Sequence, residues 1–184
     1  MLKIKGSILR SRLAFVEEQA GQAGLVKLMA ALSAPDRQAL TGLLATKWYP
    51  FELGTRLDAA IVAAIGGGDR RYFERLGAAS AEKNLKGVHK DFLVHGDPQA
   101  FLAKAPVIYS FYYDQGRREY QATGPNEAVL TTREAETFSL ADCLTVVGWH
   151  RRALELCGAR NVRVVEEECR ASGGGVCRYR IRWA

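Results

Sequence analysis

The residues whose types and spacing could do chemistry lie near the end of the sequence: Cys143, Glu166, Cys169 and Cys177. Three thiolates and a carboxylate would complete a closed tetrahedral shell around zinc, the pattern of a structural site without an open position. The alternative is that the cysteines are buried small hydrophobic residues, with Cys169 and Cys177 as a cross-strand pair of thiols. Their spacing alone leaves both interpretations open.

The acid and the first strand cysteine of this group are three positions apart. In a regular strand Glu166 and Cys169 would point to opposite faces of the sheet. A bulge between them is required if both are to reach one point. Without a bulge, Glu167 shares the face of Cys169 and is the alternative fourth ligand.

A helix and a hairpin must position these side chains. Ser139 is a good helix cap, and a strong helix pattern follows over residues 140–156. Residues 162–170 and 176–183 alternate apolar and polar side chains, and a glycine-rich loop suited to a tight hairpin joins them. A helix packed on this hairpin would lower Cys143 onto the strand cysteines.

The rest of the chain predicts an α+β domain. Residues 1–115 read mostly as helices, and residues 119–123 and 128–132 read as two strands joined by a turn. We expect N-terminal helices packed on a small, about four-stranded antiparallel sheet, in the order helices-β-β-α-β-β. The whole chain, residues 1–184, is expected to be a single ligand-binding or interaction domain, with residues 116–184 forming the ββαββ part.

Helix boundaries in the N-terminal region are marked by capping residues. Ser33, followed by Pro35, begins one helix, and Pro98 begins a further helix through Phe101 that extends toward Tyr112.

Composition and charge exclude several classes of partner. The net charge is +6 and the pI is about 9.3, but the basic residues are scattered and no block of five occurs. We therefore expect no direct binding to nucleic acid. The sequence has no apolar run of 18 residues and no apolar leader, which predicts a cytoplasmic protein without a membrane span. Four cysteines in a reducing compartment favour thiols or a metal site over disulfides.

The sequence offers no catalytic constellation. It has no pair of a nucleophile and a base, and no paired carboxylates in a plausible cleft. The glycines at residues 66–68 lack the Gly-Lys-Ser/Thr ending of a phosphate loop. We therefore predict no catalytic residues and lean against an enzyme.

Residues 166–179 resemble the C-terminal signature of 4-vinyl-reductase domains: Glu, two residues, Cys, then Ala, Gly and a second Cys eight residues on, followed by an aromatic residue. The helix with Cys143 is also similar, so that the resemblance covers about the last 45 residues. Phenol-sensing input domains of certain bacterial transcription activators share this signature. That resemblance implies a zinc ion held by Cys143, Glu166, Cys169 and Cys177. In layout, the wider superfamily is similar to heme nitric-oxide-binding sensors and to TRAPP subunits.

The same resemblance implies a small apolar ligand between the helices and the sheet. The candidate ligand-binding residues are His95, Tyr109, Tyr112, Tyr120 and Trp149. The alternative is that His95 is a loop residue and that the aromatic residues are core. Heme is disfavoured, because the chain lacks the Tyr-x-Ser-x-Arg clamp of the nitric-oxide sensors. The expected cofactor is structural zinc.

Two functions follow from the resemblance. The first is a sensory or regulatory domain for an apolar or aromatic ligand that signals through a protein partner or a homodimer. The alternative is a non-catalytic, TRAPP-like scaffold for protein–protein interaction with no ligand. The chain ends just after its last predicted strand, so we expect the output to come from a partner or from dimerisation. The aromatic residues at positions 48–51 are a candidate interface, or else the ordinary start of a buried helix.

Overall fold

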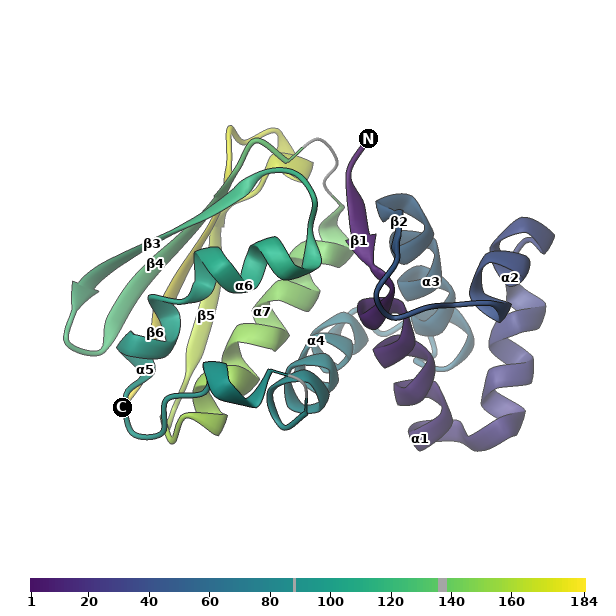
Figure 1. Ribbon diagram of the computed structural model, residues 1–184, viewed down its shortest axis with the longest axis horizontal. Helices are drawn as coiled ribbons and strands as arrows, with labels where there is room; N and C mark the ends of the chain where they lie inside the picture. Colours follow the sequence, from purple (N-terminus) through teal and green to yellow (C-terminus); the bar gives the residue numbers. More distant parts are fainter. Residues whose placement is uncertain (88, 136–138) are drawn as a thin grey trace.

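The computed structural model describes residues 1–87, 89–135 and 139–184 (Figure 1). These residues contain seven α-helices and two antiparallel sheets. The helices are α1 (Gly6–Ala31), α2 (Ala34–Thr41), α3 (Phe51–Ala64), α4 (Arg71–Leu85), α5 (Pro98–Leu102), α6 (Ala105–Tyr112) and α7 (Leu140–Leu156). The strands are β1 (Lys3–Lys5), β2 (Trp48–Pro50), β3 (Arg117–Gly124), β4 (Glu127–Arg133), β5 (Arg163–Glu168) and β6 (Cys177–Arg182). Two 3₁₀ turns, η1 (Lys90–Phe92) and η2 (Arg170–Ser172), complete the set.

The α+β class is confirmed, but the predicted order of elements was wrong at the N-terminus. Strands β1 and β2 lie among the helices and form a separate two-stranded sheet, with Ile4 opposite Tyr49. Each strand has only three residues, which is too short for an alternating pattern to be visible in the sequence. The pairing anchors Ile4, which is 3% exposed, in the core of the N-terminal helices.

The predicted helix starts are confirmed. The side chain of Ser33 accepts a hydrogen bond from the Asp36 amide at the start of α2, and Ser139 accepts one from the Asp142 amide at the start of α7. The helix expected from Pro98 to Tyr112 is in fact two helices, α5 and α6. Pro106 lies in the first turn of α6, where its missing N–H leaves no bond unmade.

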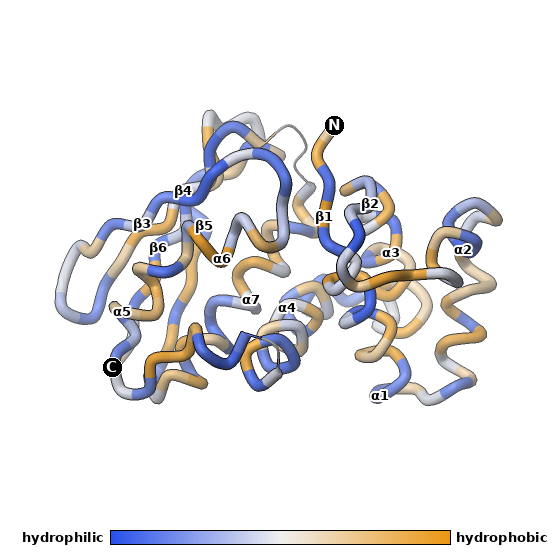
Figure 2. The backbone as a smooth tube through the Cα atoms, viewed as in Figure 1, coloured by the Kyte–Doolittle hydropathy of each residue, from blue (hydrophilic) through white to orange (hydrophobic). Residues whose placement is uncertain are grey.

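The four-stranded sheet has the order β3-β4-β6-β5, and one of its faces is covered by helices (Figure 1). Leu130, Tyr179 and Ile181 point to the covered face and are buried beneath α6 and α7. The arginines that alternate with them on β6 form ion pairs instead: Arg180, for example, pairs with Glu127 and Glu167. In Figure 2 the β3–β4 turn is mostly hydrophilic, whereas the α5–α6 segment contains hydrophobic stretches.

Helix α4 crosses α7 on the side away from the sheet, and two glycines let the backbones touch. A Cβ atom added at Gly77 would lie 1.9 Å from the Thr145 carbonyl oxygen. One added at Gly148 would lie 1.9 Å from the Glu74 carbonyl oxygen. Any larger residue at either position would therefore force the helices apart. Because of this contact, side chains near the glycines on both helices line one cavity.

Two hydrophobic clusters meet beside this crossing. One fills the space between the sheet and α6 and α7, and the other joins β1, α1 and α3. Ile8 and Tyr113 are partly buried and pack against both clusters. The junction between the two clusters is where the larger cavity described below lies.

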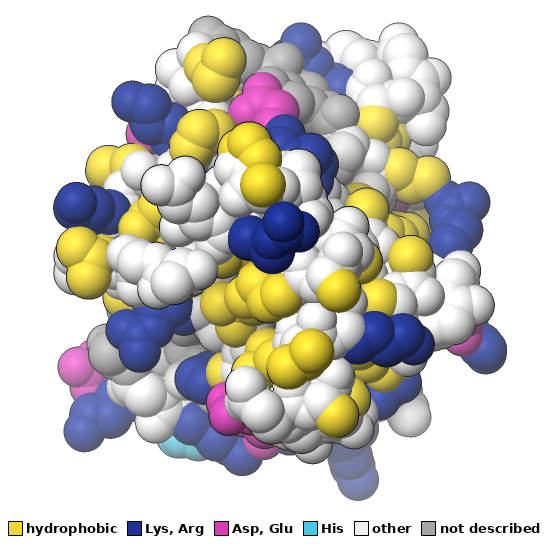
Figure 3. All heavy atoms as spheres, turned by 90° about the vertical axis from the view of Figure 1, so that its right-hand side faces the viewer, with side chains coloured by type: hydrophobic (Ala, Val, Ile, Leu, Met, Phe, Trp, Pro, Cys, Tyr) yellow, Lys and Arg dark blue, Asp and Glu magenta, His cyan; other side chains and the backbone are white. Residues whose placement is uncertain are grey.

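The surface has no concentrated basic face in the view of Figure 3, where lysine and arginine side chains are spread among uncharged and hydrophobic ones. No helix in the described ranges combines the length and the apolar character needed to cross a membrane.

Candidate functional site

Three cysteines and one acid converge at one point between α7 and the terminal hairpin. One ligand atom each from Cys143, Glu166, Cys169 and Cys177 lies within 4.8 Å of the others. The Sγ atom of Cys143 is 3.4 Å from that of Cys169 and 3.7 Å from that of Cys177. These separations are much longer than a disulfide bond of about 2.05 Å, and all four cysteines are free thiols.

The convergence depends on a bulge in β5. Glu166 pairs with Tyr179 and Glu168 pairs with Arg178, so that Glu167 is the extra residue between two neighbouring pairs. Glu167 turns to the outer face, where it forms an ion pair with Arg180. The bulge that the sequence argument required is therefore present. The acid beside the cysteines is Glu166 rather than Glu167.

The electrostatics of this group fit a cation. The Oε1 atom of Glu166 is buried and has no hydrogen-bond partner among the described residues. The hydrogen bond between Cys143 and Cys177 raises the pKa of Cys143, with burial adding to the rise, and lowers the pKa of Cys177 to about 7. A buried carboxylate oxygen without a donor and a sulfur close to ionisation are a donor set that a thiophilic metal ion would satisfy.

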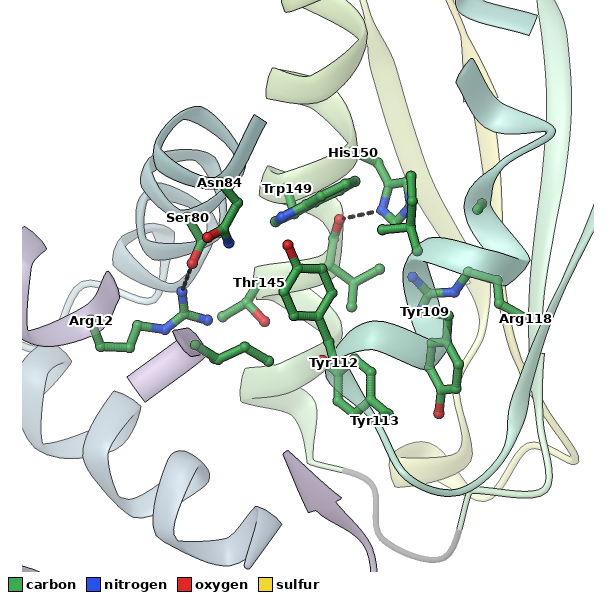
Figure 4. Close-up of a pocket in the computed structure, with 15 residues that line it drawn as sticks. Arg12, Ser80, Asn84, Tyr109, Tyr112, Tyr113, Arg118, Thr145, Trp149 and His150 are labelled. Atoms are coloured by element: carbon green, nitrogen blue, oxygen red, sulfur yellow. Dashed lines mark hydrogen bonds between the residues drawn. The ribbon is translucent and has the colours of Figure 1, made fainter. Parts of the chain in front are cut away.

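A second candidate site is a cavity of about 60 Å³ between α1, α4, α6 and α7 (Figure 4). Its apolar wall includes Ile8, Ile108 and Val146. Its polar and aromatic groups come from all the surrounding elements and include Arg12, Ser80, Asn84, Tyr112, Arg118 and His150. A volume of this size would hold about four water molecules.

Two polar atoms in the cavity wall have no partner in the described part of the chain. They are the Nδ2 atom of Asn84 and the hydroxyl of Tyr112, and both are buried. Their residues are only 6% and 7% exposed. A buried polar group left without a hydrogen bond typically costs about 1–3 kcal/mol. Buried polar groups in folded proteins usually find a partner, so these two atoms point to a bound molecule or to ordered water.

Two buried arginines line the cavity, and their surroundings differ. Arg12 forms an ion pair with Asp58 at 2.8 Å and donates to the Leu76 carbonyl and to Ser80. Arg118 is 9% exposed and donates through Nε to the Thr132 hydroxyl at 3.1 Å. Across the described ranges, no carboxylate lies within ion-pair distance of Arg118.

His150 is the buried titratable ring of the cavity. Burial and the nearby Arg118 charge lower its pKa to about 3, so the ring is neutral at pH 7. Its Nδ1 lies 2.9 Å from the Val146 carbonyl, which can only accept, so Nδ1 carries the proton. The Nε2 atom is then left as an acceptor.

The cavity includes some of the predicted ligand-binding residues and not others. Tyr109, Tyr112 and Trp149 line it. His95 lies in an exposed turn outside it. Tyr120 is on β3, where its hydroxyl donates to Gln99, also outside the cavity.

Sequence reasoning missed several of the polar residues of the cavity. Arg12 left a signal, since it stands four residues after Ile8 and four before Val16, on the apolar stripe of α1. Arg118 left none, because a charged residue at the start of a half-exposed strand is ordinary. Asn84 also left no signal, because it stands in a polar stretch of α4.

The cavity and the cysteine group share a wall. A small hollow of about 10 Å³ is lined by Tyr109 and Arg118 on the cavity side and by Cys143, Cys177 and Tyr179 on the other. The two sites are therefore separated only by directly packed side chains.

Comparison with known proteins gives a family and a fold. A family model described as "Protein of unknown function (DUF2378)" matches residues 59–184. Among curated proteins nothing matches the sequence.

The fold is similar to solved H-NOX proteins: that of K. algicida in its Fe(II) unliganded state has a TM-score of 0.72 at 13% identity, covering 98% of this chain and 96% of that one. The H-NOX protein of S. oneidensis in the Fe(II)NO state has a TM-score of 0.69 at 16% identity, and the match covers 98% of this chain and 99% of that one. A structure from a study of heme distortion in the H-NOX family has a TM-score of 0.73 at 10% identity, with 97% and 94% covered.

These likenesses correct the cofactor prediction. The sequence predicts structural zinc and disfavours heme, but the neighbours in fold are H-NOX proteins, among them one studied for its heme distortion. The missing Tyr-x-Ser-x-Arg clamp was therefore a poor guide to what this fold accommodates. The likeness to the wider superfamily is confirmed at the level of fold. The narrower resemblance to 4-vinyl-reductase domains remains a prediction.

The described residues fit heme only in part. His150 lines the cavity with a neutral ring whose Nε2 has no hydrogen-bond partner among the described residues, which is suitable for an iron ligand. The cavity of about 60 Å³ falls well short of the roughly 300 Å³ or more that ligand pockets provide. The glycine contact between α4 and α7 closes one side of this space.

Proposed function

Since the chain belongs to the DUF2378 family and has the H-NOX fold, we propose that it is a sensory or regulatory domain that binds a small molecule in the cavity between α1, α4, α6 and α7. The proposal derives from the chain's own residues, because the likeness to the solved structures concerns the fold alone. The ligand that the sequence analysis expected, an apolar or aromatic molecule, is kept as its general class.

One observation carries this proposal: the cavity has apolar walls and two buried polar atoms without partners among the described residues, on Asn84 and Tyr112. Ligand sites combine mostly apolar surface with a few polar groups that orient the ligand. In a core filled only by its own side chains, each such atom would lower stability. The observation therefore favours a ligand-binding domain over a scaffold without a ligand.

We further propose that the cysteine group is a metal site of the kind found in the phenol-sensing domains. The ligands would be Cys143 from α7, Glu166 and Cys169 from β5 and the turn after it, and Cys177 from β6. With four protein ligands the ion would have no open position, so it would fix α7 on the hairpin rather than act on a substrate. The shared wall at Arg118 would then hold one side of the ligand cavity in place.

The output of the domain is proposed to pass to a protein partner or to a second copy of the chain. Helix α7 contributes both to the cysteine group and to the cavity, and it touches α4, which leads toward the N-terminal helices. A ligand that changes how α4 and α7 cross would alter the surface of the N-terminal half.

Native mass spectrometry of the freshly purified, full-length chain tests the proposal. We expect a small organic molecule that is released on denaturation, and weaker retention by the Tyr112→Phe variant. The matched control is Tyr120→Phe, which removes a hydroxyl outside the cavity. Release of heme would support the proposal and identify the ligand. The scaffold would be favoured if the native mass equals that of the chain alone and if no added small molecule slows the hydrogen exchange of its amides.

A further inference from the structure

We infer that the ligand of this cavity is a small organic anion, a carboxylate on an apolar body, whose charge is met by Arg118. This inference rests on the proposed function and adds the chemical class of the ligand. It starts from the difference between the two buried arginines of the cavity. Arg12 has Asp58 as its counter-ion, whereas Arg118 has no carboxylate of the described residues within ion-pair distance.

A buried guanidinium without a counter-ion is costly. With the described residues, the side chain of Arg118 makes one hydrogen bond, through Nε to Thr132, and its guanidinium lies over the Tyr109 ring at 5.0 Å. The ring face gives partial compensation. A charge in a low-dielectric site is nonetheless stabilised mainly by an opposite charge with good hydrogen-bond geometry. A carboxylate would supply two acceptors to the fork of guanidinium N–H groups.

The acid on the neighbouring wall does not fill this role. Asp142 accepts a hydrogen bond from the Tyr113 hydroxyl at 3.1 Å and forms no ion pair with Arg118. The His150 ring beside Arg118 is neutral and brings no negative charge. The positive charge of Arg118 is therefore the only one facing this part of the cavity that lacks a direct partner among the described residues.

The opposite end of the cavity indicates the rest of the ligand. Asn84 and the hydroxyl of Tyr112 lie toward α4, while Arg118 lies on the side of the sheet (Figure 4). An N–H donor and a hydroxyl that lack partners in the described ranges suit an oxygen acceptor on the ligand. Between the two ends the wall is apolar, with Ile108 and Val146. The fitting molecule has a carboxylate at one end, an oxygen at the other and a short apolar body between them.

The size of the cavity limits that body. A cavity that binds benzene has a volume of about 150 Å³. The present cavity, at about 60 Å³, suits a short aliphatic chain, or a single ring if Tyr112 or Trp149 shifts outward. The probes are therefore 4-hydroxybenzoate, which carries the second oxygen, and propionate and benzoate, which lack it, each paired with the corresponding neutral amide.

Isothermal titration calorimetry and NMR titration of the full chain test the inference. We expect at least one carboxylate to bind at least about tenfold more tightly than its amide, and Arg118→Gln to remove that preference. Arg118→Lys should keep part of it. The control is Arg117→Gln, which changes the exposed neighbour on the same strand and should leave binding unchanged.

The outcomes separate this inference from the function on which it rests. Removal of an unpaired buried charge should not unfold the chain, and the comparison of acid with amide on the unaltered protein needs no variant at all. If the amides bind as tightly as the acids, or if Arg118→Gln binds the acids normally, the anion inference is wrong and the sensory proposal stands. If neither class binds and native mass spectrometry finds no ligand, both are wrong.

Discussion

Replacement of Tyr112 by phenylalanine should stabilise the ligand-free protein, although it removes a polar group from a well-packed residue. Tyr112 is 7% exposed, and its hydroxyl has no hydrogen-bond partner among the described residues. No hydrogen bond from the described residues therefore compensates the desolvation of that hydroxyl in the folded state. Phenylalanine keeps the ring and removes the oxygen.

The magnitude follows from the cost of an unsatisfied buried group, about 1–3 kcal/mol. At the lower end, the free energy of unfolding should rise by about 1 kcal/mol, which corresponds to about 2–4 °C in Tm for a chain of this size. With ligand bound the sign reverses, because the variant loses a hydrogen bond that the ligand provides. The ligand-induced rise in Tm should therefore be smaller for Tyr112→Phe than for the wild type.

The assay is urea denaturation of ligand-free protein, followed by circular dichroism, with Tyr120→Phe as the control. Tyr120 donates to Gln99, so its replacement should lower stability by about 1 kcal/mol. If Tyr112→Phe is destabilised as much as the control, the hydroxyl of Tyr112 already has a partner in solution. The unpaired atoms of the cavity would then no longer indicate a ligand.

Three further predictions concern the glycine contact, the cysteine group and the buried histidine. Gly148→Ala should lower the free energy of unfolding by about 3 kcal/mol, because the new methyl group would lie 1.9 Å from a backbone oxygen. The control Gly42→Ala should be nearly neutral, because nothing lies within 4 Å of its new methyl group. Equal effects of the two substitutions would refute the close contact at Gly148. In protein supplied with Zn(II), we expect elemental analysis to find one equivalent of this thiophilic divalent ion. The Cys177→Ala variant should lose the ion, whereas the control Cys157→Ala should retain it. Equal metal contents in the two variants would exclude the site. For His150 the folded pKa of about 3 lies below the unfolded value of 6.5, so its contribution to stability is present above pH 6.5 and is lost as pH falls toward 3. Relative to His150→Gln, the wild type should lose about 1.4 kcal/mol for each pH unit below about 6.5, measured by urea denaturation, and parallel curves would mean that the ring is not held neutral.

The C-terminal part of the fold could be predicted well from the sequence, because local signals there agree with one another. The cap at Ser139, the alternation along β6 and the glycine-rich hairpin loop all lead to the same ββαββ arrangement. The need for a bulge between Glu166 and Cys169 followed from the two-residue period of a strand, and the structure has that bulge. Strands β1 and β2 could not be predicted, because three-residue strands carry no periodic pattern.

The cavity was harder to predict than the cysteine group. Its walls come from α1, α4, α6, α7 and β3, so that Arg12, Asn84, Arg118 and His150 each stand on a different element. Arg118 and Asn84 are ordinary residues in their own segments, and their importance arises only when the helices pack. Cysteines differ in this respect, since they are rare enough for their spacing to be informative.

The close backbone contacts at Gly77 and Gly148 restrict how α4 and α7 can move relative to each other. Two helices whose side chains interlock can shift through small rotamer changes. At this crossing no side chain separates the two main chains, so they pack in direct contact. The two helices cannot approach each other more closely at that point, but their crossing angle can still change. The ligand cavity lies beside this contact, so we expect an occupant there to change the crossing angle of α4 and α7 rather than their separation.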